Sequence, residues 1–199
     1  MFPAVRPNRS VGRVGSLDTL LLDGRTYPGV RGCAVMDVRL TEFEAAQHLG
    51  LLQGWLRRPH VTRWWGDATK ALAHVAAQPP ERHRIIAVDG HPCGYACWQP
   101  LSPTEVAIVG FESFGGTHID IDILIGEGAY LGRGVGPVAL QLIVELLASQ
   151  GVSSTGLGTD VENARACRAF QKAGFQQSAE FQEGKRSLVY FTRDLGAAV

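Results

Sequence analysis

The sequence predicts one domain of the α+β (mixed α/β) class. The chain has 199 residues, 45% hydrophobic and 19% charged, which is typical of a globule with a real core and excludes a disordered chain or a coiled coil. Strand and helix patterns follow one another in the order β-α-α-β-β-β-α-β-α-β-β. This order differs from the strict alternation of a doubly wound parallel sheet, and it favours a mixed sheet flanked by helices.

The first predicted elements are a strand over residues 34–40 and a helix over residues 44–57. The helix ends before Pro59, because a proline disfavours helical geometry in the residue that precedes it. Residues 59–67, which include two adjacent tryptophans, are expected to form a loop. A second helix is predicted from residue 67 to about residue 77.

The clearest strand pattern of the chain covers residues 117–125. It follows a predicted hairpin over residues 84–98 with a longer loop, and a polar, glycine-containing connection. Since alternate side chains point to opposite faces of a strand, its isoleucines must be buried together. The opposite face carries His118, Asp120, Asp122 and Leu124.

The C-terminal part reads as two helices and three strands. Pro137 suits the first turn of a helix, which Gly151 ends, and Asn163 is expected to cap a second helix. The remaining predicted elements are strands over residues 153–161, 177–182 and 187–193, with the second helix over residues 163–172. We expect a domain over residues 34–199. Residues 1–33, with five arginines, form either an N-terminal extension or an ordered strand or turn packed on the domain.

Charge and cysteine usage exclude several functions. Nineteen basic residues balance nineteen acidic ones, which argues against a partner such as nucleic acid or a membrane surface. The neutral total hides an acidic middle, because residues 100–164 hold eight acids and one base, Arg133. Four cysteines without a C-x-x-C pair make a zinc site unexpected and fit reduced thiols in a cytoplasmic protein. The apolar run 138–148 is far shorter than the ~20 residues that span a bilayer.

The strongest chemical signal is the glycine-rich turn L-G-R-G-V-G-P over residues 131–137. Glycines allow successive backbone N–H groups to converge, and the positive end of the following helix adds to the attraction for phosphate. The turn lacks the Lys-Ser/Thr ending of a P-loop, and an ordinary tight turn is the alternative interpretation.

A second motif, N-x-x-A-x-x-x-aromatic-x-K-x-G-F, covers residues 163–175. Strand, glycine turn, helix, strand and this motif together resemble the GNAT superfamily of acyl-CoA-dependent N-acetyltransferases, with Leu131 in place of its usual Gln or Arg. Upstream, W-L-x-R-P-H-V-x-R-W-W-G (residues 55–66), G-Y-A (94–96) and I-D-I-x-I-G (121–126) resemble the aminoglycoside 6′-N-acetyltransferase branch.

The resemblance implies a GNAT fold, a mostly antiparallel sheet whose parallel central strands splay to admit the pantetheine arm. It implies acetyl-CoA as cosubstrate without a metal, and Asp122 as the residue that binds or deprotonates the acceptor amine. Backbone groups near residues 123–124 would polarise the thioester. The implied cofactor-binding residues are Ile123, Leu124, Ile125, Leu131, Gly132, Arg133, Gly134, Val135, Gly136, Pro137, Asn163, Ala166, Phe170 and Lys172.

Two positions depart from the family pattern. Gly158 replaces an aspartate that often precedes the last helix, and Asp160 either substitutes for that carboxylate or only supports the helix N-terminus. Phe170 falls where the family often has a tyrosine that protonates the leaving thiolate. That proton would then come from water or from the substrate.

The predicted acceptor is a small polycationic amine, because the acidic stretch suits an aminoglycoside better than an acidic metabolite. Trp64, Trp65, Asp120, Asp122 and Asp160 are the expected substrate contacts, with one tryptophan buried and the other lining the cleft. Two alternatives stay open: a siderophore-type lysine N-acyltransferase and a non-catalytic acyl-CoA-binding regulatory module. The sequence leaves a monomer and a homodimer equally open.

Overall fold

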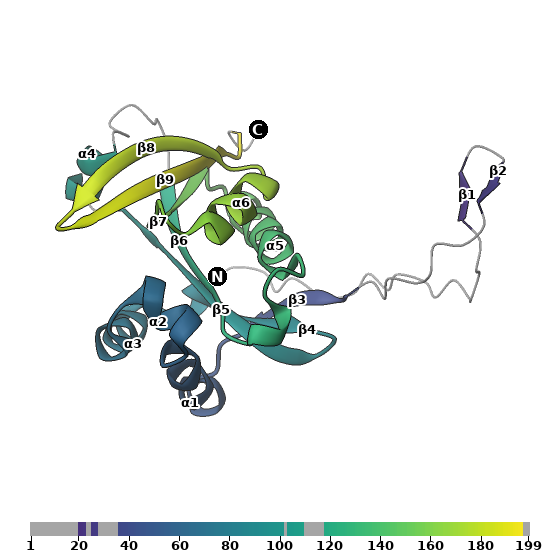
Figure 1. Cartoon of the computed structure of the whole chain (residues 1–199), viewed down its shortest axis with the longest axis horizontal. Coiled ribbons are helices and arrows are strands. Elements are labelled where there is room, and N and C mark those ends of the chain that lie inside the picture. Colours follow the sequence, from purple (N-terminus) through teal and green to yellow (C-terminus); the bar gives the residue numbers. More distant parts are fainter. Residues whose placement is uncertain (1–19, 23–24, 28–35, 102, 110–117, 197–199) are drawn as a thin grey trace, which may run out of the picture. The chain divides into compact units, whose positions relative to one another are not determined.

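The computed structural model describes residues 20–22, 25–27, 36–101, 103–109 and 118–196 (Figure 1). The chain divides into two units, residues 1–35 and residues 36–199. In the first unit, β1 (Leu20–Leu22) pairs with β2 (Arg25–Tyr27) in antiparallel fashion. None of the described helices is both long enough and apolar enough to span a membrane.

The second unit is built on a seven-stranded sheet in the order β3-β4-β5-β6-β7-β9-β8. Every neighbouring pair is antiparallel except β6 and β7, which are parallel. This confirms the predicted mixed, mostly antiparallel sheet. Its strands are β3 (Val38–Glu42), β4 (His83–Val88), β5 (His91–Pro100), β6 (His118–Ile125), β7 (Ser154–Asp160), β8 (Gln176–Glu183) and β9 (Arg186–Asp194).

Helices cover both faces of this sheet (Figure 1). Because side chains alternate along a strand, Ile86 of β4 packs with α5 and α6, whereas Ile85 packs with α1, α2 and α3. The helices are α1 (Ala45–Leu56), α2 (Pro59–Trp65), α3 (Ala68–Ala77), α4 (Pro103–Val109), α5 (Val135–Ser149) and α6 (Ala164–Lys172), with single 3-10 turns at Pro80–Arg82 and Gly128–Tyr130.

The two parallel strands separate soon after they meet. Their pairing is limited to His118 with Ser154, Ile119 with Thr155, and Asp120 with Gly156. Beyond that point β6 pairs only with β5, and β7 pairs only with β9. The predicted splay is therefore present, and it opens a split whose walls are the C-terminal ends of β6 and β7.

Two segments expected to be irregular are short helices. Residues 59–67 contain α2, because Pro59 occupies its first position, where a missing N–H costs no hydrogen bond, and Arg58 before it is extended with ψ 136°. The connection before β6 contains α4, which also starts with a proline. In the hairpin, a tight turn with positive φ at Asp89 and Gly90 replaces the longer loop we expected.

Candidate active site

A cleft of about 1120 Å³ occupies the split between β6 and β7. It brings together residues from α2, β6, the glycine-rich turn, β7, α6 and β9, which are far apart in the sequence. Every residue that the sequence predicted for the site lines this cleft except Arg133, which is exposed on the turn and is not among the lining residues.

One wall of the cleft presents the glycine-rich turn. Gly132 (φ +74°) and Gly134 (φ +87°) adopt left-handed geometry, which explains why the turn requires glycine there. Helix α5 starts at Val135, so the N–H groups of Val135 and Gly136 have no acceptor within the helix. Pro137, also in the first turn, has no N–H to satisfy. These amides and the helix dipole together suit an anionic group.

Helix α6 forms the adjoining wall. The Asn163 side chain caps it by accepting a hydrogen bond from the Ala166 N–H at 3.3 Å, as predicted. Phe170 is buried and packs edge-on against Phe191, with ring centroids 5.6 Å apart. Because its ring carries no hydroxyl, Phe170 contributes shape to the cleft and no proton.

Asp122 projects from β6 with a side chain 39% exposed. Its Oδ2 lies 3.7 Å from His74 Nε2 on α3 and 4.0 Å from Cys97 Sγ on β5. The nearby Asp122 carboxylate raises the pKa of His74, against an opposing effect of burial. Burial, followed by the negative charge of Asp122, raises the pKa of the Cys97 thiol to about 12. The sequence had not indicated His74 or Cys97, because they come from other elements and form no local motif.

Asp120, two residues earlier on the same face, has different surroundings. Its Oδ1 accepts a hydrogen bond from the Tyr190 hydroxyl at 2.7 Å. That hydroxyl lies 3.0 Å from His118 Nε2, and His118 Nδ1 lies 2.8 Å from Ser154 Oγ. Burial, then the charge of Asp122, raises the pKa of Asp120, and the Tyr190 hydrogen bond only partly offsets this. The side chain is thus held in a partly buried polar network.

Small residues on β7 make room for Tyr190. A Cβ added at Gly156 would lie 2.5 Å from the Tyr190 ring and hydroxyl, which is closer than real atoms approach. At Gly158 the same atom would make an ordinary contact at 3.5 Å. Gly158, where the sequence departs from the family pattern, therefore lies beside Tyr190 of β9. The hydroxyl of this tyrosine donates to Asp120 of β6.

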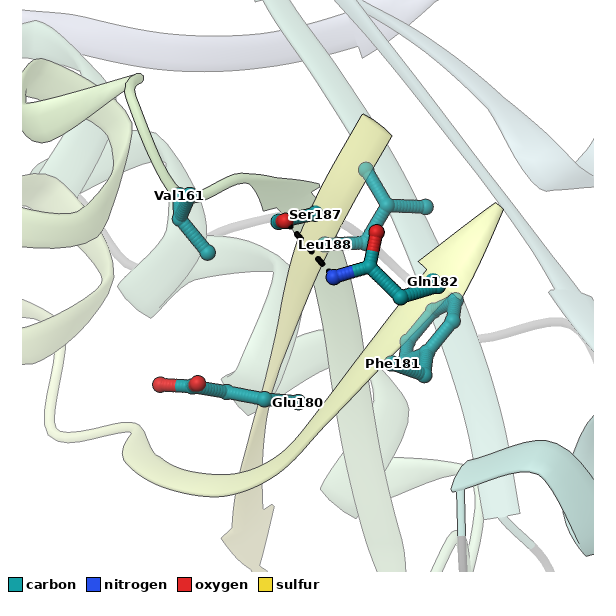
Figure 2. A pocket seen from close by; sticks show the side chains of 6 residues that line it. All are labelled: Val161, Glu180, Phe181, Gln182, Ser187 and Leu188. Atoms are coloured by element: carbon teal, nitrogen blue, oxygen red, sulfur yellow. Dashed lines mark hydrogen bonds between the residues drawn. The ribbon is translucent and has the colours of Figure 1, made fainter. Parts of the chain in front are cut away.

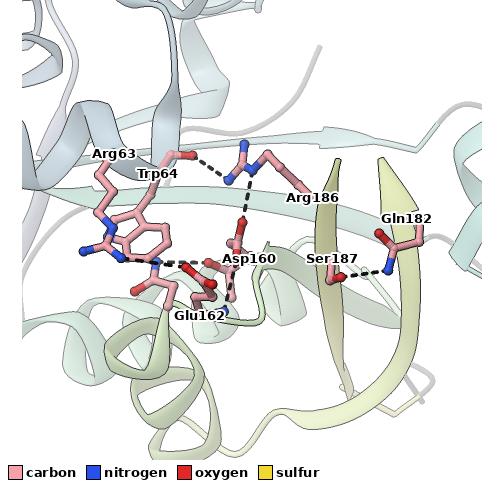
Figure 3. Close-up of polar contacts among 9 residues, drawn as sticks. Arg63, Trp64, Asp160, Glu162, Gln182, Arg186 and Ser187 are labelled. Atoms are coloured by element: carbon pink, nitrogen blue, oxygen red, sulfur yellow. Dashed lines mark hydrogen bonds and ion pairs between the residues drawn. The ribbon is translucent and has the colours of Figure 1, made fainter. Parts of the chain in front are cut away.

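Asp160 lines the cleft with its carboxylate already engaged (Figure 3). It accepts a hydrogen bond from the Glu162 N–H at 2.9 Å and pairs with Arg186 Nε at 3.1 Å. These contacts, the backbone one first, lower the pKa of Asp160. Arg186 also donates to the Trp64 carbonyl at 3.4 Å, so it joins β9 to α2. The backbone contact to Glu162 fits the supporting role that we considered for Asp160.

Both tryptophans are half-buried and line the cleft, so our expectation that one of them would be fully buried is wrong. Trp65 packs against the cluster beneath α1 to α3 and still reaches the cleft. The Arg63 guanidinium lies over the Trp64 ring, 4.5 Å from its centroid, and pairs with Glu162 at 3.8 Å. Arg63, Trp64 and Arg186 therefore lie together at one side of the cleft (Figure 3).

A smaller hollow of about 480 Å³ lies on the outer strands (Figure 2). Its polar groups include Gln182, which donates to the Ser187 hydroxyl at 2.7 Å. None of the residues that the sequence predicted for the site lines it. Its lining residues are Val161, Glu180, Phe181, Gln182, Ser187 and Leu188.

The fold and the cleft define an acyltransferase of the N-acetyltransferase type, and comparison with known proteins agrees. A family model described as Acetyltransferase (GNAT) domain matches residues 44–183. The chain is 30% identical over 162 residues to the aminoglycoside N(6′)-acetyltransferases type 1 of Klebsiella pneumoniae and Serratia marcescens, covering 73% of this chain and 77% of each relative. The chain therefore belongs to the GNAT acetyltransferase family.

Solved structures show the same relationship. Aminoglycoside acetyltransferase AAC(6′)-Ib in complex with coenzyme A is 27% identical, with a TM-score of 0.63 over 79% of this chain and 95% of that one. Its complex with coenzyme A and kanamycin gives the same TM-score at 26% identity and the same coverage. The aminoglycoside N(6′)-acetyltransferase of Legionella pneumophila, at 20% identity and a TM-score of 0.62, shares the fold. The predicted fold and enzyme class, an acetyl-CoA-dependent N-acetyltransferase, are confirmed.

Proposed function

We propose that this enzyme transfers an acetyl group from acetyl-CoA to the 6′-amino group of an aminoglycoside antibiotic, which would confer resistance. The observation that carries the proposal is that Asp122 lines the same cleft as the glycine-rich turn at the start of α5, whose geometry suits a phosphate group. The relatives support the proposal, since they are aminoglycoside N(6′)-acetyltransferases.

The donor side of the cleft fits acetyl-CoA. The amides of Val135 and Gly136 would bind the pyrophosphate, and the pantetheine arm would enter the split beside residues 123–125 of β6. Beyond Asp120, β6 no longer pairs with β7, so backbone groups of this edge other than the Ile125 carbonyl, which lies 3.2 Å from His60 Nε2, would be available to the arm and to the thioester carbonyl. Asn163, Ala166, Phe170 and Lys172 line the same region.

The acceptor amine must lose a proton before it can attack, because primary amines are mostly protonated at pH 7. Asp122, directly or through one water, would take that proton. The amine nitrogen then forms a bond to the thioester carbon, the C–S bond breaks, and CoA leaves as a thiolate. Since Phe170 has no hydroxyl, the thiolate would take its proton from water or from the acceptor.

Carboxylates and an aromatic face would hold the cationic acceptor. Asp120, Asp122 and Glu105 line one part of the cleft, and Trp64 lines another. Ammonium groups suit such carboxylates, and a sugar ring can stack on tryptophan. Acetylation would remove one positive charge and one hydrogen-bond donor from the drug. We place the reaction in the cytoplasm, where acetyl-CoA is supplied and where the described cysteines would stay reduced.

The test measures release of the CoA thiol from acetyl-CoA with kanamycin or tobramycin as acceptor. We expect acceptor-dependent release by the unmutated enzyme and a loss of at least ~tenfold in kcat for Asp122→Asn, with CoA binding retained. Asp89→Asn is the control, because asparagine suits the same hairpin turn far from the cleft. Unchanged turnover in Asp122→Asn would refute the role of Asp122. If none of the tested aminoglycosides supports thiol release by the unmutated enzyme, the proposal is refuted.

A further inference from the structure

Three metal-binding types of side chain converge beside the cleft, from α3, β5 and β6. His74 Nε2, Cys97 Sγ and an Asp122 carboxylate oxygen all lie within 4.8 Å of one another. His74 and Asp122 side chains are 43% and 39% exposed, whereas Cys97 is buried at 1%. Solvent therefore reaches two donors of the cluster, and the third lies beneath them.

The donor set matches a borderline-soft divalent cation. Zn²⁺ binds imidazole nitrogen, thiolate sulfur and carboxylate oxygen, and its tetrahedral geometry places such donors about 3.4–3.6 Å apart. The observed spacings from Asp122 Oδ2 are 3.7 Å to His74 Nε2 and 4.0 Å to Cys97 Sγ. Along these two edges the side chains would have to move by a few tenths of an ångström, and the third edge, between His74 Nε2 and Cys97 Sγ, is within 4.8 Å.

We propose that His74, Cys97 and Asp122 bind a Zn²⁺ ion, and that the bound ion inhibits acetyl transfer by occupying the carboxylate of Asp122. Three protein ligands leave a fourth position for water, so the ion would be exchangeable. On binding, the Cys97 thiol releases its proton to solvent and the sulfur coordinates as thiolate. A cationic acceptor and the ion would then compete for one carboxylate.

The three ligands lie 23 and 25 residues apart in the sequence, so they form no local zinc motif. The site is also independent of the donor wall, since none of its ligands belongs to the glycine-rich turn or to α6. Binding of the ion itself does not depend on the proposed function. Its inhibitory effect rests on the proposed role of Asp122.

Cobalt provides a readout that needs no turnover. Co²⁺ takes the same ligands as Zn²⁺ and is coloured, so titration of the whole chain should give the visible bands of a tetrahedral ion and a thiolate charge-transfer band. We expect one ion per chain, displaced by Zn²⁺. Cys97→Ser should abolish the charge-transfer band, whereas Cys167→Ser, on α6, should keep it. A cobalt spectrum without a thiolate band in the unmutated protein would overturn the site.

Inhibition supplies the second readout. Zn²⁺ should inhibit thiol release competitively with the aminoglycoside, and at least ~tenfold more zinc should be needed in His74→Ala, each variant compared with its own metal-free rate. His91→Ala, in the exposed hairpin turn, is the matched control. His74 is exposed, so its variant tests the site even where Cys97→Ser fails to fold. Equal inhibition of all variants by zinc would refute the assignment of the ligands. If the protein gives the expected cobalt spectrum but shows no turnover with any aminoglycoside, the proposed function fails and the metal site stands.

Discussion

Asp120 and Asp122 show how two identical side chains on one strand face acquire different chemistry. Asp120 is held by the Tyr190 hydroxyl within a partly buried network. Asp122 faces a half-exposed histidine and a thiol, and 39% of its side chain remains exposed. An amine entering the cleft can therefore reach Asp122 without breaking the Tyr190 hydrogen bond, which is the physical reason for proposing Asp122 as the base.

The Asp120 network makes stability depend on pH. Because the folded state raises the pKa of Asp120 above its ordinary value, the resulting stabilisation is complete below about pH 4 and is lost as pH rises through the folded-state pKa. Asparagine does not titrate and can still accept the Tyr190 hydrogen bond. We therefore compare the free energy of unfolding of Asp120→Asn with that of the unmutated protein. The difference, variant minus unmutated, should rise by roughly 1 kcal/mol or more between pH 4 and pH 8.

Urea unfolding at a series of pH values measures this difference. Glu145→Gln, on the exposed face of α5, is the control and should give a difference that stays flat with pH. A flat difference for Asp120→Asn as well would show that its carboxyl group is not perturbed in the folded protein.

At the scale of elements, the close packing of Tyr190 on β7 places its hydroxyl against Asp120, on the side of the cleft proposed for the acceptor. β6 and β7 pair at Asp120 and Gly156 and then separate. The Tyr190 ring lies over the β7 backbone at that last pair, and the absence of a side chain at Gly156 allows it. The strand junction, Tyr190 and Asp120 therefore form one structural unit.

This unit predicts different effects for two similar substitutions. Gly156→Ala should cost about 1–3 kcal/mol of stability, because its Cβ must displace the Tyr190 ring and disturb the hydrogen bond to Asp120. Gly158→Ala should stay within about 0.5 kcal/mol, since its Cβ makes an ordinary contact. Denaturant unfolding of the two variants gives the comparison. Equal losses would mean that Tyr190 is not packed against Gly156.

Periodicity predicted the long elements and missed the short ones. In β6, burial alternates as predicted up to Asp122, whereas Leu124 from the opposite face is buried and Ile123 and Ile125 are half-buried. The helices over residues 45–56 and 135–149 lie within two residues of their predicted bounds. α2 and α4 have seven residues each, too few for a helical stripe to show, and each begins with a proline. A proline that ends one helix and starts the next reads in the sequence only as a break.

At the scale of the whole molecule, the acidic stretch is only partly directed at the acceptor. Of its eight acids, Glu105, Asp120, Asp122, Asp160 and Glu162 line the cleft. Glu127 instead pairs with Arg58 at 2.6 Å, Glu145 lies on the outside of α5, and Glu112 lies outside the described residues. Arg186 pairs with Asp160, and Arg63 pairs with Glu162. The negative charge offered to a substrate is therefore smaller than the eight acids of residues 100–164 suggest.

Local motifs and tertiary contacts contributed different parts of the site. The glycine turn, the Asn163 cap and Asp122 are recognisable from their sequence neighbours, and they line the cleft except for Arg133 of the turn. His74, Cys97, Tyr190 and Arg186 enter through packing of distant elements, and no spacing in the sequence relates them. Those residues contact the carboxylates of the acceptor side, so these charge contacts could be found only in the structure.

The central claim, acetyl transfer to a 6′-amine, is tested most directly by a matched pair of acceptors. Neomycin and paromomycin differ only in carrying an amino group or a hydroxyl group at the 6′ position. With acetyl-CoA and the unmutated enzyme, we predict thiol release at least ~tenfold faster with neomycin than with paromomycin. Equal rates with both acceptors, or no release with either, would contradict the account.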